Sequence, residues 1–248
     1  MISIIIPMYN QNDLTKQCIE AIRHTTSDYE ILVIDNGSEV PFQIPGSDVE
    51  IIRHEKNLGF PVAVNQGIEA TNGEIICLLN NDVIVTKGWA EKLVSKLEHY
   101  DIIAPCTNYA AGMQRVVLPT YTNEEQLNDQ ADIWSREHQH VEEVSYVIGF
   151  CMMFERSLFE TIGEFDESLW PCSGEELDFC LRARASGFKI AIDYGTYVHH
   201  YGSETFKSMQ QAGELDYEDI CIRNEKHVAA KWGDDFWEKQ MIQPEKSA

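Results

Sequence analysis

Residues 1–105 alternate between continuous apolar runs and amphipathic stretches, and this alternation limits the chain to few folds. The apolar runs are rich in β-branched residues, as in strands buried on both faces. They cover residues 2–6, 30–34, 49–53, 74–79, 83–85 and 102–105. The stretches with helical spacing cover residues 12–24, 61–71 and 88–99. Strands and helices that alternate through short connections predict an α/β fold, with a parallel sheet covered by helices on both faces.

The alternation weakens after residue 105. Residues 123–143 contain seven acidic residues against the single Arg136, which predicts a solvated helix or a mobile loop. The rest predicts a core strand, two helices, two short strands and an amphipathic helix, over residues 145–154, 155–163, 174–186, 188–193, 196–202 and 213–240. We expect one domain made of a nucleotide half and an acceptor half, followed by a helical tail. The domain covers residues 1–210, with the nucleotide half over 1–105 and the acceptor half over 106–210. The tail covers residues 211–248.

The charge of the chain excludes one class of partner. It carries 41 Asp and Glu against 19 Lys and Arg, a formal net charge of −22. Such a chain repels DNA, RNA and anionic lipids at long range, so we expect no nucleic-acid partner. A phosphate ligand would need a local source of positive charge, for which a bound metal ion is the obvious candidate.

The cysteines and the N-terminus bear on location. The seven cysteines are scattered without a CxxC pair, as in the reduced thiols of a cytoplasmic protein. The start, MISIIIPMYN, lacks the basic residues and long apolar stretch of a signal peptide. No apolar run approaches the ~18 residues that a transmembrane segment needs. We therefore expect a soluble cytoplasmic protein, which is compatible with peripheral membrane contact.

Several motifs of nucleotide-binding proteins and hydrolases are absent. The sequence contains no GxG pair, no GxxxxGK loop, no GxSxG elbow and no HExxH helix. An α/β sheet without these motifs must bind its ligand by other groups at the carboxyl ends of its strands.

Three predicted strands end in polar or aromatic residues. The ends are Pro7-Met8-Tyr9-Asn10, Asp35-Asn36 and Asn80-Asn81-Asp82. In a parallel sheet they open on the same edge, where they offer an aromatic face, a carboxylate for a base N–H and a carboxylate for a cation. This set suits a nucleobase and a metal-bound diphosphate. An ordinary turn is the alternative interpretation of Asp35-Asn36.

Six segments follow one another in a specific order and spacing: IIPMYN, VIDNGS, NLGFPVAVNQGIEATNGEIICLLNNDV, GEFDESLW, GEELDFCLRARASGF and VHHYGSETF. Together they resemble family 2 glycosyltransferases with the GT-A fold, from residue 2 to about residue 206. The C-terminal RNEKHVAAKWG resembles the tail of bacterial surface-polysaccharide members. The resemblance implies a mostly parallel, Rossmann-like sheet flanked by helices, with a C-terminal acceptor-side region and a helical tail.

The resemblance also implies a nucleotide site. Tyr9 would stack on the nucleobase, and Asp35 would recognise it. The Asn-x-Gly-Phe segment and the asparagine after it would line the site, here Asn57, Gly59 and Asn65. The other strand-end residues expected beside the nucleotide are Pro7, Asn10, Asn36 and Asn81.

In this family an Asp-x-Asp motif holds Mn²⁺ or Mg²⁺ on the diphosphate. Here the motif is Asn80-Asn81-Asp82, so water and one more side chain must help Asp82 to complete the ligand shell. His200 is the expected extra ligand, because VHHYGSETF resembles a His-x-Gly-x-x-Ser/Thr signature with Thr205 in register. His199 lies on the opposite side of a strand, so we expect only one of the two histidines to face the site. A structural histidine is the alternative interpretation.

Inverting transfer needs a carboxylate that takes the proton of the acceptor hydroxyl. The resemblance places Glu176 at the position of the catalytic Asp, with Glu175 and Asp178 as alternatives. Asp178 is also the expected acceptor contact. The residues alone leave another interpretation open: Ser173-x-x-Glu176 is a capping box, and the acids suit the positive end of a helix.

Two further segments resemble the acceptor side of the family. Gly149-Phe150-Cys151 resembles the small-residue turn that faces the sugar, and Phe165-Asp166-Glu167 resembles a loop leading to the base. Trp170 beside this loop suits either stacking on a sugar ring or packing in the core.

These features predict an inverting, metal-dependent glycosyltransferase. The donor would be a nucleotide sugar with UDP or dTDP, and the acceptor a glycan or a lipid-linked hydroxyl. One alternative is a non-catalytic module of the same fold that binds nucleotide sugars. A sugar nucleotidyltransferase is the second alternative, but the first loop lacks the glycines and arginine that such an enzyme needs.

Overall fold

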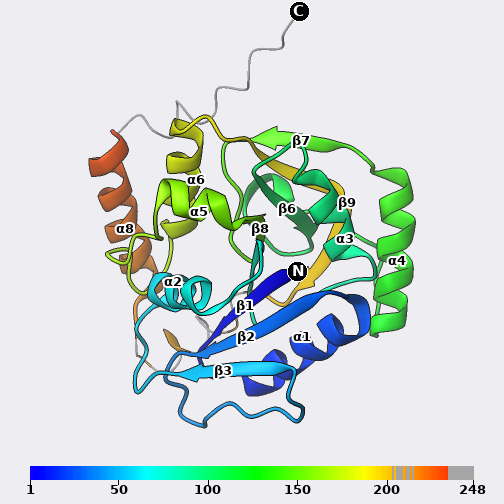
Figure 1. The fold of residues 1–248 in the computed structure, drawn as a ribbon, viewed down its shortest axis with the longest axis horizontal. Helices are drawn as coiled ribbons and strands as arrows, with labels where there is room; N and C mark the ends of the chain where they lie inside the picture. The colour runs from blue at the N-terminus through cyan, green and yellow to red at the C-terminus, as the bar shows by residue number, and fades with distance from the viewer. Residues whose placement is uncertain (203, 205–208, 211–212, 214, 234–248) are drawn as a thin grey trace, which may run out of the picture.

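The computed structural model describes residues 1–202, 204, 209–210, 213 and 215–233. They form a nine-stranded sheet in the order β3-β2-β1-β4-β8-β6-β9-β5, with β7 paired to β9 (Figure 1). The strands are β1 (Ile2–Met8), β2 (Tyr29–Asp35), β3 (Val49–Arg53), β4 (Ile75–Leu79), β5 (Val83–Ile84), β6 (Ile102–Thr107), β7 (Val141–Val144), β8 (Cys151–Glu155) and β9 (Ile190–His200). The helices are α1 (Asn12–Thr25), α2 (Phe60–Ala70), α3 (Trp89–Lys96), the 3-10 helix η1 (Gly112–Gln114), α4 (Glu124–Glu137), α5 (Arg156–Ile162), α6 (Glu175–Ala185) and α8 (Tyr217–Trp232). The expected α/β class is confirmed.

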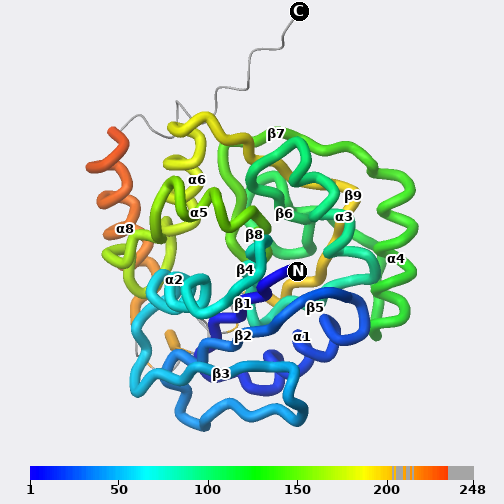
Figure 2. Tube along the Cα trace, in the orientation of Figure 1, coloured from blue at the N-terminus to red at the C-terminus, as the bar shows by residue number. Residues whose placement is uncertain are grey.

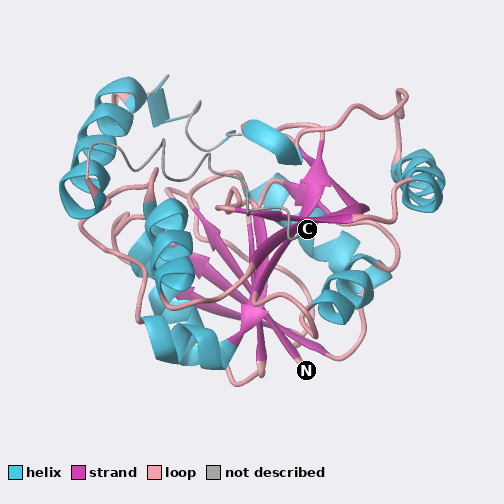
Figure 3. Ribbon diagram, turned by 90° about the horizontal axis from the view of Figure 1, so that it is seen from above, coloured by secondary structure: helices cyan, strands magenta, loops and turns pink. Residues whose placement is uncertain are grey.

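The first half of the chain forms the parallel part of the sheet. β1 lies between β2 and β4, with Ile4 opposite Ile31 on one side and Cys77 on the other. All seven residues of β1 are buried, and helices lie on both sides of the sheet (Figure 3). The carboxyl ends of β1, β2 and β4 lie at one edge, which confirms the expected meeting of the three strand ends.

The second half extends the same sheet with strands of both directions. β8 runs antiparallel to β4 and β6, whereas β6 and β9 are parallel. The short strands β5 and β7 pair antiparallel with β9. In Figure 2 the blue and cyan strands of the first half continue into the green and yellow strands of the second half.

The core strand expected over 145–154 is shorter than predicted. Only its last part is a strand, β8, while Ile148, Gly149 and Phe150 form the loop before it. The backbone N–H of Ile148 donates instead to Oε1 of the buried Gln114 at 2.6 Å. The apolar sequence signals burial at these positions, and Phe150 is buried although the loop has no strand partner.

The two short strands expected over 188–193 and 196–202 are one strand, β9. Its register with β6 shifts: Pro105 pairs with Asp193, but the next residue pairs with Tyr197. The residues between form a bulge that is closed by the buried carboxylate of Asp193. This carboxylate accepts hydrogen bonds from the N–H of Gly195 at 3.0 Å and from the hydroxyl of Thr196 at 2.6 Å. The sequence predicted a break between residues 193 and 196, but the strand continues there through a bulge.

The acidic segment 123–143 contains a helix, which confirms one of its two expected forms. Asn123 caps α4, because its side-chain oxygen accepts from the N–H of Gln126 at 2.9 Å. Leu127 and Ala131 are the buried residues of α4. The strand β7 that follows was not predicted from the sequence.

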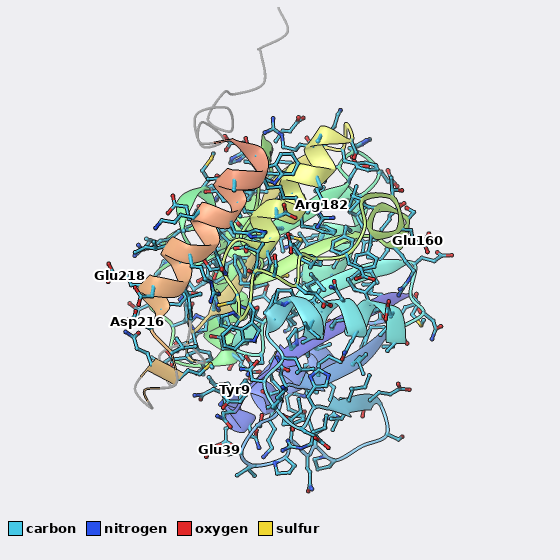
Figure 4. All side chains as sticks on the ribbon, turned by 90° about the vertical axis from the view of Figure 1, so that its left-hand side faces the viewer. Tyr9, Glu39, Glu160, Arg182, Asp216 and Glu218 are labelled. Atoms are coloured by element: carbon cyan, nitrogen blue, oxygen red, sulfur yellow. The ribbon has the colours of Figure 1, made fainter. Side chains whose placement is uncertain are left out.

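The last helix, α8, lies beside α6 (Figure 4). Val228 of α8 packs with Leu169, Leu177 and Leu181 in a small apolar cluster. The helix expected over 213–240 begins at Tyr217, and its residues after 233 lie outside the described part of the chain. Within the described residues, no helix combines the length and apolar character needed to cross a membrane.

Candidate active site

Two adjoining cavities open at the carboxyl edge of the parallel strands. The first is lined by Pro7, Met8, Tyr9, Asn36, Asn57, Phe60, Asn80, Asn81, Asp82, Pro171 and Met209. The second, with a volume of about 600 Å³, is lined by Phe60, Asn80, Tyr109, Ala110, Ala111, Arg115, Ile148, Gly149, Phe150, Cys172, Ser173, Glu175, Glu176, His200 and Tyr217. Phe60 and Asn80 line both cavities, so the two meet there.

Most of the residues expected at the nucleotide line the first cavity. They are Pro7, Tyr9, Asn36, Asn57 and Asn81, together with the expected metal ligand Asp82. Tyr9 directly follows β1, and Figure 4 labels it. Four other expected residues are not in the wall of this cavity: Asn10, Asp35, Gly59 and Asn65.

Asp35 is fully buried, and both oxygens of its carboxylate accept hydrogen bonds from other residues of the protein. Oδ1 accepts from the N–H of Ser38 at 2.9 Å, and Oδ2 accepts from the N–H of Phe42 at 3.0 Å and from the guanidinium of Arg53. Burial alone would raise the pKa of Asp35, but these hydrogen bonds outweigh it and lower the pKa. In this structure Asp35 therefore holds the loop after β2 and does not present a free carboxylate to a base.

Asn36 lines the first cavity, but it too is engaged. Its amide nitrogen donates to Oδ1 of Asn57 and to the carbonyl of Gly59, both at 3.0 Å, and its oxygen accepts from the N–H of Leu58 at 2.9 Å. Asn36 thereby fixes the loop of residues 57–59 against the end of β2.

Asn10 and Asn81 brace neighbouring parts of the same wall. Asn10 has a left-handed backbone with a φ of 56°. Its N–H donates to the hydroxyl of Ser38 at 2.8 Å, and its side-chain oxygen accepts from the N–H of Glu39 at 2.9 Å. Asn81 donates to the hydroxyl of Thr15 at 3.0 Å. These contacts tie the ends of β1 and β4 to α1 and to the loop after β2.

Gly59 and Trp170 lie against each other, although the sequence assigned them to different substrates. A Cβ atom on Gly59 would lie 2.6 Å from Cδ1 of Trp170, and the φ of Gly59 is +92°. The next N–H, of Phe60, donates to the carbonyl of Pro171 at 2.7 Å. Trp170 is 43% exposed and does not line the second cavity, so its expected place on the acceptor side is not borne out. A close approach of two loops explains the glycine.

Asn65 also has a different place from the one expected. Its amide nitrogen donates to the carbonyl of Phe165 at 2.9 Å and to Oε1 of Glu167 at 3.2 Å, while its oxygen accepts from the N–H of Phe165 at 2.9 Å. All its hydrogen-bonding atoms thus serve the loop of residues 165–167. Asn65 is 3% exposed and holds this loop instead of lining the nucleotide cavity.

Asp82 and His200 meet where the two cavities join. Oδ1 of Asp82 lies 3.1 Å from Nε2 of His200, and both residues are about 95% buried. Nδ1 of His200 lies 2.8 Å from the carbonyl of Tyr109, so Nδ1 carries the proton and Nε2 presents a lone pair in the neutral ring. Nε2 lies within ion-pair distance of Asp82 yet has no partner with hydrogen-bond geometry. Distance alone does not make a hydrogen bond, so the lone pair of Nε2 is left without a donor.

An unpartnered imidazole nitrogen beside a carboxylate oxygen fits a divalent cation. A backbone carbonyl that fixes the other ring nitrogen is the usual support of a metal-binding histidine. Within the described residues no group of three or more His, Cys, Asp or Glu gathers, so substrate oxygens and water would have to complete the shell.

His199 faces away from this junction, as expected for the neighbouring residue of a strand. Its Nδ1 lies 2.7 Å from the hydroxyl of Tyr121, which also bonds the hydroxyl of Tyr197 at 2.9 Å. Burial, together with the nearby His200, lowers the pKa of His199. Of the two histidines, only His200 lines the second cavity. Thr205 of the same signature lies outside the described residues.

Glu175 and Glu176 begin α6 and line the second cavity. Each has a buried Oε2 without a hydrogen-bond partner. Burial raises the pKa of both carboxyls, and the charge of Glu176 raises the pKa of Glu175 further. Backbone N–H groups at the start of α6 act in the opposite direction on Glu176. Two carboxyls with raised pKa values in one cavity are typical of a proton-transfer site.

The capping box is not formed. The N-cap of α6 is Gly174, without a side-chain cap, and the hydroxyl of Ser173 donates to the sulfur of Cys221 at 3.5 Å. Gly149 lies against Glu176, since a Cβ on Gly149 would be 3.4 Å from Cβ of Glu176. The small residue expected on the acceptor side therefore leaves room beside this carboxylate.

Asp178 points away from the second cavity, so its expected roles as acceptor contact or base are wrong for this structure. Residues two apart on a helix do not share a face. Oδ2 of Asp178 accepts from Nε of Arg182 at 2.9 Å, and Oδ1 accepts from Nε1 of Trp232 at 2.9 Å and lies 2.7 Å from Nζ of Lys231. Asp178 therefore joins α6 to α8.

Sequence reasoning missed two asparagines that support the site. Asn224 of α8 is 1% exposed, and its amide nitrogen donates to the carbonyls of Leu169, Cys172 and Ser173 at 3.1, 2.7 and 3.0 Å. Asn108 donates to the carbonyl of His200 at 3.0 Å and accepts from its N–H at 2.9 Å. No local pattern marks either residue, because each acts on a segment far away in the sequence.

Comparisons with known sequences match this architecture. The model of glycosyl transferase family 2 matches residues 3–163. Glycosyltransferase AglE of Haloferax volcanii is 25% identical over 210 residues, covering 80% of this chain and 66% of its own length. The uncharacterized glycosyltransferase EpsJ of Bacillus subtilis is 25% identical over 227 residues, covering 87% and 65%. The chain spans just under two thirds of the length of these two relatives.

Solved structures agree on the fold. GalNAc-T7 with UDP, GalNAc and Mn²⁺ has a TM-score of 0.63 at 18% identity, over 81% of this chain and 43% of its own. S. aureus TarS in complex with UDP-GlcNAc has a TM-score of 0.60 at 14% identity, over 92% and 65%. The fold is therefore GT-A, and with the match over residues 3–163 the chain belongs to glycosyl transferase family 2.

Proposed function

We propose that the chain is an inverting, metal-dependent glycosyltransferase that moves a sugar from a nucleoside diphosphate to an acceptor hydroxyl. One observation supports this most: Asp82 and the unpartnered Nε2 of His200 lie where the first cavity meets the second. The second cavity also contains the two carboxyls at the start of α6. In this proposal the cation-binding pair and the carboxylate base lie in two adjoining cavities.

In this proposal the first cavity takes the donor nucleotide. Tyr9 packs on the base, and the segment of residues 57–59, fixed by Asn36, forms the adjoining wall. Asp35 acts through the loop that it holds. A donor with UDP or dTDP suits this arrangement. The similar structures of GalNAc-T7 and TarS contain UDP and UDP-GlcNAc, which supports a UDP donor.

Asp82 and His200 would hold Mn²⁺ or Mg²⁺ together with diphosphate oxygens and water. When bound, the ion supplies positive charge that stabilises the leaving diphosphate. The carbonyl of Tyr109, 2.8 Å from Nδ1 of His200, would orient the ring so that Nε2 faces the ion. Mn²⁺ accompanies UDP in the similar structure of GalNAc-T7.

Glu176 takes the proton of the acceptor hydroxyl. The hydroxyl oxygen bonds to the anomeric carbon as the bond from that carbon to the diphosphate oxygen breaks, and attack from the opposite side inverts the configuration. Glu175 lines the same cavity and is the alternative base. Burial raises the pKa of both carboxyls, and the charge of Glu176 raises the pKa of Glu175 further.

A non-catalytic module that binds nucleotide sugars remains the second candidate. Its support is the single carboxylate in Asn80-Asn81-Asp82 and the lack of a third metal ligand within the described residues. We also propose that the nucleotide half ends at residue 105 and the acceptor half at residue 210. The acceptor in this proposal is a glycan or a lipid-linked hydroxyl, and the protein acts in the cytoplasm. The seven free cysteines suit the cytoplasm.

Thermal shift with UDP and dTDP, each with Mn²⁺ or with EDTA, followed by hydrolysis assays of the corresponding sugar donors, tests this function. We expect Mn²⁺-dependent binding and slow donor hydrolysis. Glu176→Gln should bind donor normally and turn over ~10²–10⁴-fold more slowly, the usual contribution of a positioned base. The exposed Glu160 of α5 provides the control Glu160→Gln. Donor binding without any turnover by the unmodified protein would favour the binding module.

A further inference from the structure

The second cavity contains one cation. Among the described residues that line either cavity, Arg115 is the only Lys or Arg. Its side chain is exposed, and its guanidinium forms no ion pair or hydrogen bond with any described residue. Arg156 and Arg223 also lack an ion pair with a carboxylate among the described residues, but each donates to backbone carbonyls, which Arg115 does not. The two acidic residues that line the same cavity, Glu175 and Glu176, form no ion pair with it.

The backbone that carries Arg115 is firmly held. The preceding Gln114 is 2% exposed, donates to the carbonyl of Pro105 at 3.1 Å and accepts from the N–H of Ile148 at 2.6 Å. The N–H of the following Val116 donates to the carbonyl of Thr107 at 2.9 Å. Arg115 therefore projects from a fixed position between two anchored neighbours, which reduces the entropy that a bound group would cost.

A donor diphosphate is not the natural partner of this cation. In the proposed function the donor side is the first cavity, which Arg115 does not line, and the ion held by Asp82 and His200 would neutralise the diphosphate. Arg115 lines the cavity of Glu176, where the acceptor hydroxyl must lie. A net charge of −22 repels an anionic acceptor, so a local cation would be needed to hold one.

We propose that Arg115 binds an anionic group, phosphate or carboxylate, on the acceptor close to the hydroxyl that receives the sugar. A guanidinium binds both anions through two parallel N–H donors. This inference rests on the proposed function and adds to it the chemical class of the acceptor. Arg115 would thus favour acidic or phosphorylated glycans over neutral ones.

Binding of three matched probes tests this, with the first cavity saturated by UDP and Mn²⁺. The probes are α-D-glucose 1-phosphate, the methyl glycoside of glucuronic acid, and methyl α-D-glucopyranoside. All three have a pyranose ring with the gluco configuration, and they carry a phosphate, a carboxylate and no charge, respectively. Calorimetry should show that at least one anionic probe binds about tenfold tighter than the neutral one, the size of one charge-assisted hydrogen bond. The probe whose affinity exceeds that of the neutral probe identifies the preferred anion as phosphate or carboxylate.

Variants assign the effect to the residue. Arg115→Gln should remove the preference for the anion, and Arg115→Lys should retain part of it. Arg136→Gln is the control, because it removes the same charge from an exposed arginine of α4. UDP affinity should be unchanged in all three variants. Equal binding of charged and neutral probes, or a preference that survives Arg115→Gln, overturns the inference.

A loss of UDP affinity in Arg115→Gln would instead place the residue at the donor and would also overturn it. Failure of the unmodified protein to bind UDP with Mn²⁺ is a separate result, since it contradicts the proposed function itself.

Discussion

Asn65 of α2 and the backbone of Phe165 exchange two hydrogen bonds, both 2.9 Å long, across one hundred residues of sequence. The side-chain amide of Asn65 pairs with both backbone groups of Phe165, donating to its carbonyl and accepting from its N–H, as a residue of an adjacent β-strand would. The loop that it holds leads to the segment with Trp170 and to α6. The parallel half of the sheet is thereby connected to the carboxylates of the second cavity.

The first prediction concerns this connection. Asn65→Ala leaves the buried N–H and carbonyl of Phe165 without partners, so the free energy of unfolding should fall by about 1–3 kcal/mol. Urea unfolding measures this change. Because Asn65 does not line the first cavity, UDP affinity should remain within about twofold, a difference well below 1.4 kcal/mol. A tenfold loss of UDP affinity in folded Asn65→Ala would restore the nucleotide contact expected from the sequence.

The second prediction concerns the metal. Asp82→Asn should abolish Mn²⁺ binding in the presence of UDP, and His200→Ala should weaken it about tenfold or more, because the unpartnered Nε2 is lost. Electron paramagnetic resonance of free Mn²⁺ measures both. His199→Ala is the matched control, since His199 bonds Tyr121 and not Asp82. Equal losses for the two histidines would contradict the assignment.

Asn108→Ala extends this test to the support of His200. The variant removes both hydrogen bonds that hold the backbone of His200. Mn²⁺ affinity should fall by up to about 10–100-fold, as for other groups that orient a metal ligand. Unchanged affinity would show that β9 alone positions the histidine.

The third prediction concerns Asp178, for which sequence and structure imply different results. As an acceptor contact it would affect the KM of the acceptor. As the link between α6 and α8 it should affect stability, and Asp178→Asn should cost about 1–3 kcal/mol by weakening the contacts with Arg182 and Lys231. Asp132→Asn breaks an exposed pair with the same spacing on α4 and should cost less than about 1 kcal/mol. A stable Asp178→Asn with a raised acceptor KM would contradict this structure.

Much of the fold could be predicted, because burial determines it locally. Ile4, Ile5 and Ile6 of β1 are fully buried between two strands, and such runs have few alternatives. The loop before β8 was misjudged because Phe150 is equally buried without being in a strand. An apolar sequence specifies burial, whereas the partner of its backbone is determined by residues elsewhere, here Gln114.

The candidate site could be predicted only to the level of segments. Tyr9, Asp82, His200 and Glu176 line the cavities because strand ends and helix starts place them there. Asp35, Asn65 and Asp178 are equally polar, but long-range hydrogen bonds engage them in the scaffold. Sequence spacing does not show whether a polar side chain faces a cavity or another loop, so these residues could not be separated from the others.

The last prediction concerns the pH dependence that Glu176 imposes. Activity requires the ionised carboxylate, and burial raises its pKa above the ordinary value of 4.5. Turnover should therefore increase with pH until it passes this raised pKa. Stability should respond in the opposite direction, because the folded protein retains protons that the unfolded chain has already released. This contribution is fully present below pH 4.5 and is lost as pH rises through the folded pKa.

Turnover and urea unfolding, measured over one pH series, test both directions. Glu176→Gln should abolish the rise in turnover and should reduce the fall in stability, since glutamine does not titrate. Other carboxyls, such as Asp35, have lowered pKa values and contribute in the opposite sense, so they cancel in the difference between the unmodified protein and the variant. This difference contains Glu176 and the part of the Glu175 pKa shift that the charge of Glu176 causes. Glu160→Gln should reproduce both curves of the unmodified protein. If Glu175→Gln removed the pH dependence of turnover and Glu176→Gln retained it, the base would be Glu175, because both carboxyls line the cavity in which the acceptor must bind.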